Sequence, residues 1–165
     1  ISGVLAIADA LKSGKAVLTT LNLGDNNLGP EGGKAIADAL KSGTAVLTDL
    51  DLQGNDIGKD GTIAIAEALK SGTSVLTKVN ILANSFNNET ANMLLKAKEE
   101  STNLVTLCGI ASDQTEASFR GCGLKAPDAL LLSAELKVNT VLRNLSVAFN
   151  DIRGEEAQQL SLIHI

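Results

Sequence analysis

The sequence predicts an α/β fold built from a repeated unit in which short parallel strands and helices alternate. The first observation is that residues 18–46 and 47–75 are one 29-residue unit written twice, with 17 identical positions in a gapless alignment. The second is that the hydrophobic period changes within each unit, from the alternation of a strand to the spacing of an amphipathic helix. Similarity at a fixed period indicates a stack of like units, each burying its apolar side against the next.

Each unit opens with the pattern L-x-x-L-x-L-x-x-N-x-L. The pattern positions of the two units are Leu18, Leu21, Leu23, Asn26 and Leu28, followed by Leu47, Leu50, Leu52, Asn55 and Ile57. A strand followed by a helix, repeated without a return strand, makes neighbouring strands parallel and covers one face of their sheet with helices.

Residues 1–17 are interpreted as the tail of a preceding unit, because residues 7–14 recur one period later. Three helices are expected to end in Leu-Lys-Ser-Gly, where glycine supplies a left-handed residue after the last turn. These glycines are Gly14, Gly43 and Gly72. We expect Asn139 to take the same left-handed position after a later helix, because asparagine is the next best residue there.

The later units are less regular. A third unit spans residues 76–104, and the period then breaks at residues 105–113. Nine residues are too few for a strand, a helix and a return, so we interpret 105–113 as an irregular insert that produces a kink or a protruding loop. The repeat resumes at residues 114–141, one residue shorter, and continues in a partial unit at residues 142–159.

The two ends of the chain are interpreted separately from this single repeat domain. The chain begins at Ile1 rather than Met and in the middle of a unit, so we expect it to be a fragment of a longer array. Residues 160–165 break the repeat, and we interpret them as a non-native tail left by cloning or sequencing. This tail contains His164, the only histidine.

The units resemble the leucine-rich repeats of the ribonuclease-inhibitor type, whose helix-bearing repeats are among the longest in their class. The resemblance covers most of the chain and rests on the recurrence of the L-x-x-L-x-L-x-x-N-x-L pattern in register. It implies a curved, right-handed leucine-rich-repeat solenoid, with parallel strands on the concave face and helices on the convex face. Proteins of that family mostly bind other proteins, and they share no single partner.

Composition narrows the range of functions. The net charge is −5 and no cluster of Lys or Arg stands out, which argues against binding to a nucleic-acid backbone. No apolar run approaches the ~20 residues of a membrane span. We expect a cytoplasmic protein, and the sequence leaves its oligomeric state and the identity of its protein partner open.

A polar residue recurs at the ninth position of the pattern. We expect these side chains to bond buried backbone groups in the turn that leaves each strand. The family that the units resemble accepts either Asn or Cys at this position. The predicted structural ladder is Asn26, Asn55, Asn84, Cys122 and Asn150.

The two cysteines form no metal or redox motif. Cys108 and Cys122 lie 14 positions apart, with no C-x-x-C spacing and no histidine nearby in the sequence. We interpret Cys122 as a free, buried thiol. Cys108 lies in the insert, and a disulfide between the two is the alternative.

No catalytic set is apparent in the sequence. A Ser-His-Asp or Cys-His arrangement needs a histidine, and the only one is in the interpreted tail. The glycine-rich residues 29–33 are not followed by the G-K-[ST] of a phosphate loop. We therefore expect a protein that is not an enzyme and has no cofactor or metal site.

The candidate binding surface is the concave face. Side chains alternate along a strand, so the residues between the inward-facing leucines point away from the helices. The set is polar apart from Leu82, and its acids cluster on the second strand. Its other members are Thr20, Asn22, Asp49, Asp51, Gln53, Lys78, Asn80, Glu116, Ser118, Arg120, Asn144 and Ser146.

Three functions are compatible with this surface. The first is a protein-interaction module that binds a partner on its concave face as part of a longer array. The second is a regulator of an enzyme, such as a GTPase activator, with Arg120 or Arg143 as the reactive arginine. The third is a structural spacer with no partner of its own.

Overall fold

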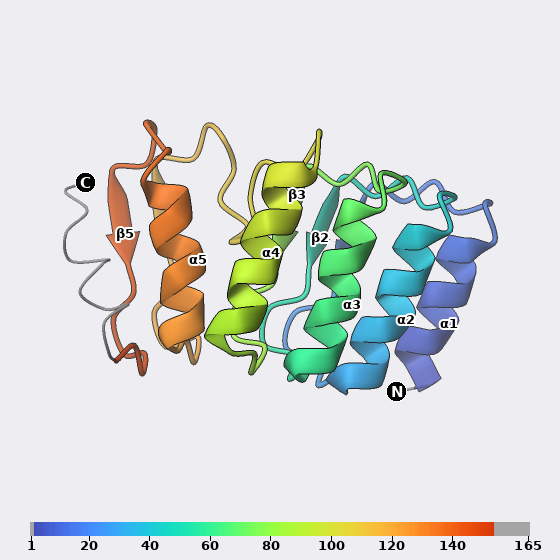
Figure 1. Cartoon of the computed structure of the whole chain (residues 1–165), viewed down its shortest axis with the longest axis horizontal. Helices are drawn as coiled ribbons and strands as arrows, with labels where there is room; N and C mark the ends of the chain where they lie inside the picture. The colour runs from blue at the N-terminus through green and yellow to red at the C-terminus, as the bar shows by residue number, and fades with distance from the viewer. Residues whose placement is uncertain (1, 154–165) are drawn as a thin grey trace.

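The computed structural model describes residues 2–153, which form a row of helices over one face of a row of short strands (Figure 1). The helices are α1 (Ser2–Lys12), α2 (Gly29–Lys41), α3 (Gly58–Lys70), α4 (Asn88–Glu100) and α5 (Ala126–Leu136). The strands are β1 (Thr20–Asn22), β2 (Asp49–Asp51), β3 (Lys78–Asn80), β4 (Glu116–Ser118) and β5 (Asn144–Ser146). This alternation is the α/β repeat fold predicted from the sequence. The interpreted tail and the end of the last unit, residues 154–165, lie outside the described residues.

The strands pair in the register that the repeat dictates. β1, β2 and β3 are parallel, with Leu21 beside Leu50 and Leu50 beside Val79. Leu50 and Val79 are completely buried. The pattern leucines of successive units therefore form one continuous apolar layer beneath the helices, because each unit covers the side of the next.

The helices of the two most similar units approach closely because glycines face each other between them. A Cβ atom placed on Gly33 would lie 2.5 Å from Cγ2 of Ile57 and 3.1 Å from Cα of Gly61. A Cβ atom on Gly61 would lie 3.0 Å from the carbonyl oxygen of Pro30. Any side chain at these positions would push α2 and α3 apart, which explains the small residues on their facing sides.

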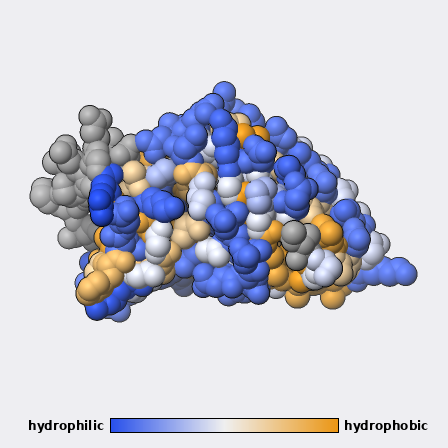
Figure 2. Space-filling view, turned by 90° about the horizontal axis from the view of Figure 1, so that it is seen from below, coloured by the Kyte–Doolittle hydropathy of each residue, from blue (hydrophilic) through white to orange (hydrophobic). Residues whose placement is uncertain are grey.

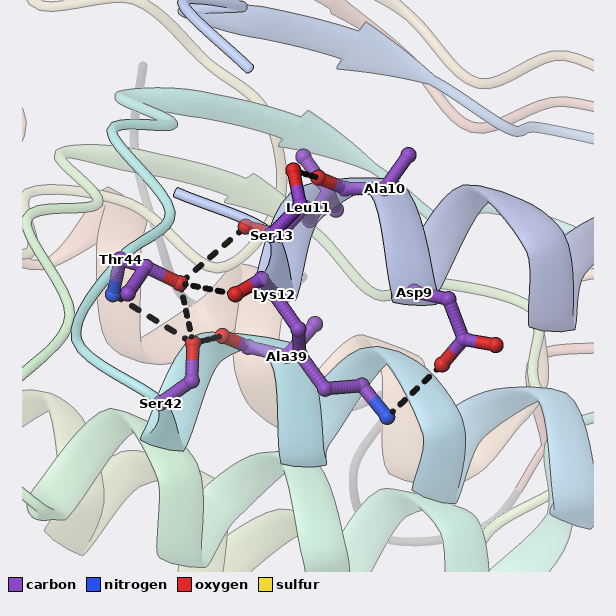
Figure 3. Close-up of polar contacts among 8 residues, drawn as sticks. All are labelled: Asp9, Ala10, Leu11, Lys12, Ser13, Ala39, Ser42 and Thr44. Carbon is purple, nitrogen blue, oxygen red and sulfur yellow. Dashed lines mark hydrogen bonds and ion pairs between the residues drawn. The ribbon is translucent and has the colours of Figure 1, made fainter. Parts of the chain in front are cut away.

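Threonines that follow α2 and α3 bond the last carbonyls of the helix in the unit before. The Thr44 hydroxyl donates to the carbonyl oxygens of Leu11 at 3.1 Å and Lys12 at 3.2 Å, at the end of α1 (Figure 3). Thr73 makes the same contact with the carbonyl of Leu40 at 3.2 Å. The last carbonyls of a helix have no partner inside it, so these threonines satisfy groups that would otherwise need water.

The predicted left-handed glycines are confirmed, and the prediction for Asn139 is wrong. Gly14, Gly43 and Gly72 have φ angles of 69°, 71° and 73°. Asn139 does not have a positive φ. Its side chain instead accepts hydrogen bonds from the amides of Val141 at 2.9 Å and Leu142 at 2.8 Å, so a turn held by the side chain replaces the left-handed cap.

The sheet breaks after β3 into a three-stranded and a two-stranded part. The first residues of the insert still follow β3: the Val105 amide donates to the Thr77 carbonyl at 2.8 Å, and the Val79 amide donates to the Thr106 carbonyl at 3.0 Å. Leu107 is completely buried. The expectation of a protruding loop is therefore wrong for these residues, because Leu107, Cys108 and Ile110 of the insert are buried in the core, although Val105 is 54% exposed.

Glu135 of α5 caps the edge where the sheet stops. Its side chain accepts hydrogen bonds from the Thr106 hydroxyl at 2.7 Å, from the Cys108 amide at 3.2 Å and from the Leu107 amide. Glu135 is only 5% exposed, and the Lys98 ammonium lies 3.7 Å from its carboxylate. A buried carboxylate thus takes the place of the next strand.

The opposite edge of the break is capped in a similar way. By register, the carbonyl of Glu116 on β4 would be the acceptor for the Leu107 amide in a continuous sheet. The side-chain amide of Gln114 donates to this carbonyl at 2.6 Å instead. Beyond the break, β4 and β5 pair in parallel with the shortened 28-residue offset, Ala117 beside Leu145.

Asp128 at the start of α5 replaces a third backbone partner that a regular next unit would supply. In regular units the amide before the ladder residue donates to a carbonyl of the next unit, as Asp25 does to Gln53 at 2.8 Å. The equivalent amide of Ala83 donates to the Asp128 carboxylate at 2.7 Å, and the Lys125 amide donates to it at 2.8 Å. Burial raises the pKa of Asp128, although these amides favour its charged form.

We predict that Leu50→Ala lowers the free energy of unfolding by about 2–5 kcal/mol, because it opens a cavity in a layer shared by three strands. Equilibrium denaturation in urea measures this change. Leu18→Ala, at a pattern position that is 44% exposed, is the matched control and should cost clearly less. Equal losses for the two variants would contradict the continuous apolar layer.

A second prediction concerns pH. Because the pKa of Asp128 is raised in the folded state, the folded protein binds this proton more tightly than the unfolded chain does. The stability contribution of this carboxyl therefore grows as pH falls through the folded pKa toward the ordinary value of about 4. Asp128→Asn keeps an oxygen for the Ala83 amide but does not titrate.

The Tm of the wild type minus that of Asp128→Asn should therefore rise between pH 7 and about pH 4, as followed by circular dichroism. The exposed Asp113→Asn provides the control, and its difference should change less. A gap for Asp128→Asn that stays constant or shrinks over this range would contradict the assignment.

Candidate binding surface

The face of the sheet opposite the helices carries the candidate binding surface. Successive side chains of a strand point to opposite faces, and the leucines of the pattern face the helices. We call the exposed or half-buried predicted residues of this side the strand face. They are Thr20, Asn22, Asp49, Asp51, Gln53, Lys78, Glu116, Ser118, Arg120, Asn144 and Ser146.

Two predicted members do not belong to this surface. Asn80 is only 9% exposed and Leu82 is completely buried. The insert covers Asn80, since a Cβ atom on Gly109 would lie 2.9 Å from the Cβ of Asn80. The Asn80 amide nitrogen donates to Gln53 Oε1 at 2.9 Å, so its polar group is used within the protein.

Charges on the strand face are partly paired between neighbouring strands. The Lys78 ammonium lies 2.7 Å from the Asp49 carboxylate, with 34% and 29% of the two side chains exposed. Within the described part of the chain, Asp51 has no ion pair, and its carboxylate accepts from the Gln53 amide at 3.0 Å. The predicted acidic cluster is therefore reduced to one uncompensated carboxylate, since Lys78 neutralises Asp49.

Asparagines at the ends of the strands join each unit to the one before it. Asn55 Oδ1 accepts from the amides of Asn26 at 2.9 Å and Leu28 at 3.3 Å. Asn55 Nδ2 donates to three carbonyls, including that of Leu23 in the previous unit at 2.7 Å. Asn84 repeats these contacts one unit later, and both side chains are completely buried.

The second sheet has a shorter version of the ladder. Asn150 Oδ1 accepts from the Leu124 amide at 3.0 Å, as Asn55 does from Leu28. Cys122 packs against the core, and its thiol forms a hydrogen bond with the carbonyl of Arg120 at 3.8 Å. Because Cys122 opens the second sheet, it has no preceding strand at its side to bridge.

The burial of Cys122 differs from the prediction, and the structure places Cys108, for which no burial was predicted. Cys122 is half-buried rather than buried, whereas Cys108 in the insert is completely buried. Burial raises the pKa of the Cys108 thiol well above its ordinary value. Both thiols are free, so the alternative of a disulfide between them does not hold in this structure.

Sequence reasoning missed a backbone constraint beside the ladder. The residue before each ladder position has a positive φ, whatever its type. These residues are Asp25, Gly54, Ala83, Gly121 and Phe149, with φ angles of 56°, 66°, 58°, 67° and 60°. Aligning the last unit with the first would have revealed Phe149 as an unusual occupant, because it stands where the first units have Asp and Gly.

Phe149 is also the most unusual side chain on this side of the molecule. It is 74% exposed, and the Arg120 guanidinium lies 4.0 Å from the centre of its ring. A shallow hollow of about 380 Å³ lies between β4 and β5, lined by residues that include Ser118 and Ser146.

Figure 2 views the edge where the helices begin; hydrophilic residues cover most of its middle, and hydrophobic ones gather toward the α1 end.

The surface offers hydrogen bonds and a few charges. Among residues 2–153, no group of three or more His, Cys, Asp or Glu side chains is arranged to hold a metal ion. Over the same residues, no helix is both long and apolar enough to cross a membrane. The geometry is that of an accessible, mostly polar sheet face on a repeat scaffold.

The fold and this face define an α/β repeat protein. The family model described as "Leucine Rich repeat" matches residues 15–37 and 45–66, each of which covers a strand, its ladder asparagine and the first part of a helix. These two matches support a leucine-rich repeat protein, and domains of this kind generally mediate protein–protein interactions. No curated protein matches the chain.

We predict that Asn55→Ala lowers the free energy of unfolding by about 3–5 kcal/mol, because buried amides and carbonyls lose their partner. Asn26→Ala is the matched control. Asn26 is exposed and donates only to the carbonyls of Leu23 and Gly24, so its loss should be about 1 kcal/mol. Equal effects in urea denaturation would show that the ladder does not act between units.

Proposed function

We propose that this chain is a non-catalytic protein–protein interaction module, part of a longer leucine-rich repeat array that binds a partner through its strand face. The observation that carries the proposal is the accessibility of this face. Of the thirteen predicted residues, eleven are exposed or half-buried. Nine of these lie on the five strands of two parallel sheets, and Gln53 and Arg120 follow β2 and β4. Such a regular polar surface suits multi-point recognition of a protein.

We further propose the ribonuclease-inhibitor-like type, with a right-handed curve and the strands on the concave side. Neighbouring strands lie about 4.8 Å apart, whereas packed helices need about 8–10 Å. A stack with one strand and one helix in each unit is therefore shorter on its strand side. This difference supports a curve that places the strand face inside.

The alternative functions have weaker support. A GTPase activator supplies an arginine that reaches the transferred phosphoryl group. The Arg120 guanidinium stacks on Phe149, and Arg143 donates to the carbonyl of Thr140 at 2.9 Å. Both arginines thus have contacts within the chain. A turnover assay with small GTPases tests this alternative, and a result without acceleration would discard it. A structural spacer would show no specific partner at all.

A cytoplasmic location is part of the same proposal. The two thiols are free, which is the state that a reducing compartment maintains. Localisation of the tagged full-length protein by microscopy tests this.

The test of the main proposal reverses charge on β2. We predict that Asp49→Lys/Asp51→Lys reduces recovery of specific partners in a quantitative pull-down at least fivefold, because both carboxylates lie on the strand face. The matched control is Asp38→Lys/Asp60→Lys, which makes the same charge change on exposed sites of α2 and α3. Melting curves establish that both variants fold. Unchanged recovery with the β2 variant would contradict binding through the strand face.

A further inference from the structure

Phe149 occupies a position whose backbone conformation disfavours an aromatic residue. It precedes the ladder residue Asn150 and has a φ of +60°, a conformation that favours Gly, Asn or Asp. The equivalent positions in the first two units hold Asp25 and Gly54. A bulky residue in this conformation is strained, and strain of this kind concentrates at functional sites.

The Phe149 ring is barely buried against the core. With 74% of its surface exposed, Phe149 contributes almost no burial to the stack. Aromatic side chains and arginine are enriched at the cores of protein–protein interfaces. The repeat imposes the left-handed conformation on this position in every unit, but it does not require a bulky residue there or an exposed ring.

Arg120 gives this ring a charged neighbour. It follows β4, and its guanidinium lies 4.0 Å from the ring centre, within the range of a cation–π contact. No described carboxylate forms an ion pair with Arg120. The acids closest in the sequence to Arg120 and to Phe149 have other partners. Glu116 accepts a hydrogen bond from Asn144 at 2.9 Å, and Asp151 pairs with Arg153.

The charge distribution favours an acidic ligand at this place. Residues 2–104 contain nine basic and twelve acidic side chains, whereas residues 105–153 contain five of each. The negative charge of the described chain is therefore concentrated in the first sheet's units. An acidic segment meets less repulsion over β4 and β5, and Arg120 there offers a planar guanidinium suited to a carboxylate.

We propose that Arg120 and Phe149 form the anchor site for an extended acidic segment of a partner protein. A carboxylate of the segment binds the Arg120 guanidinium, and an adjoining apolar side chain packs on the open side of the Phe149 ring. The hollow between β4 and β5 is lined by Ser118 and Ser146 and also by Glu116, so it receives neighbouring uncharged residues of the segment. This inference rests on the proposed function and names the chemistry of the partner.

A random peptide library displayed on phage, panned against the whole chain, tests the anchor site. Enriched peptides should carry Asp or Glu next to an apolar residue. A synthetic copy of the most enriched peptide then gives a Kd by fluorescence anisotropy. We expect Arg120→Gln and Phe149→Asn each to weaken binding at least tenfold, and we expect the wild-type affinity to fall as salt is raised.

The variants are chosen to keep the fold. Asparagine tolerates the left-handed conformation of residue 149, so Phe149→Asn removes the ring without straining the turn. Asp38→Asn/Asp60→Asn on exposed sites of α2 and α3 is the control and should leave the Kd within about threefold. Asp49→Asn/Asp51→Asn on the other sheet reports whether the peptide binds elsewhere on the strand face. A circular dichroism melt of each variant checks that it folds.

The outcomes separate the anchor site from the proposed function. Peptides without an acidic residue, an unchanged Kd in Arg120→Gln and Phe149→Asn, or no enrichment at all would overturn the anchor site. If binding responds to Asp49→Asn/Asp51→Asn but not to the anchor variants, the strand face still binds and only the anchor site fails. If binding responds to neither set, both the anchor site and recognition through the strand face are contradicted.

Discussion

The buried carboxamide at the end of each strand is the interaction on which the stack depends. A chain that leaves a strand and turns into a helix exposes several backbone amides and carbonyls, and these groups need partners once they are buried. Asn55 supplies five such partners, some in its own unit and some in the unit before. Apolar layers alone would let units slide, whereas this bonding fixes one register between them.

The break in the sheet obeys the same requirement by other means. Where no regular unit follows β3, side chains of α5 accept hydrogen bonds from the backbone. Glu135 accepts from the amides of Leu107 and Cys108, and Asp128 accepts from the amide of Ala83. An acidic side chain at a strand edge accepts hydrogen bonds but cannot continue the ladder, so it also prevents another strand from pairing there. The insert thus ends one sheet cleanly and lets a second begin.

The regular part of the fold could be predicted because its information is local and repeated. The leucines, the ladder asparagines and the glycines that follow the helices recur at one period, so each unit predicts the next. The position of the break was predicted from the loss of the period at residues 105–113. The contacts that close it could not be predicted, because they join residues with no shared pattern, such as Glu135 and Leu107, which are 28 positions apart. The same cause explains the wrong prediction for Asn80, since nothing in the repeat indicates that Gly109 would cover it.

The candidate site was predictable only as far as strand alternation reaches. Alternation identifies which side chains face away from the helices, but it says nothing of their pairing, so the contact of Lys78 with Asp49 came from the structure. Stacking fixes the residues that successive units share, so the recognition that we propose uses the positions where the units differ. Phe149 is such a position, and its backbone conformation is imposed by a ladder that has no need of a ring. For that reason, the departure from the repeat is a stronger indication of function here than the repeat itself.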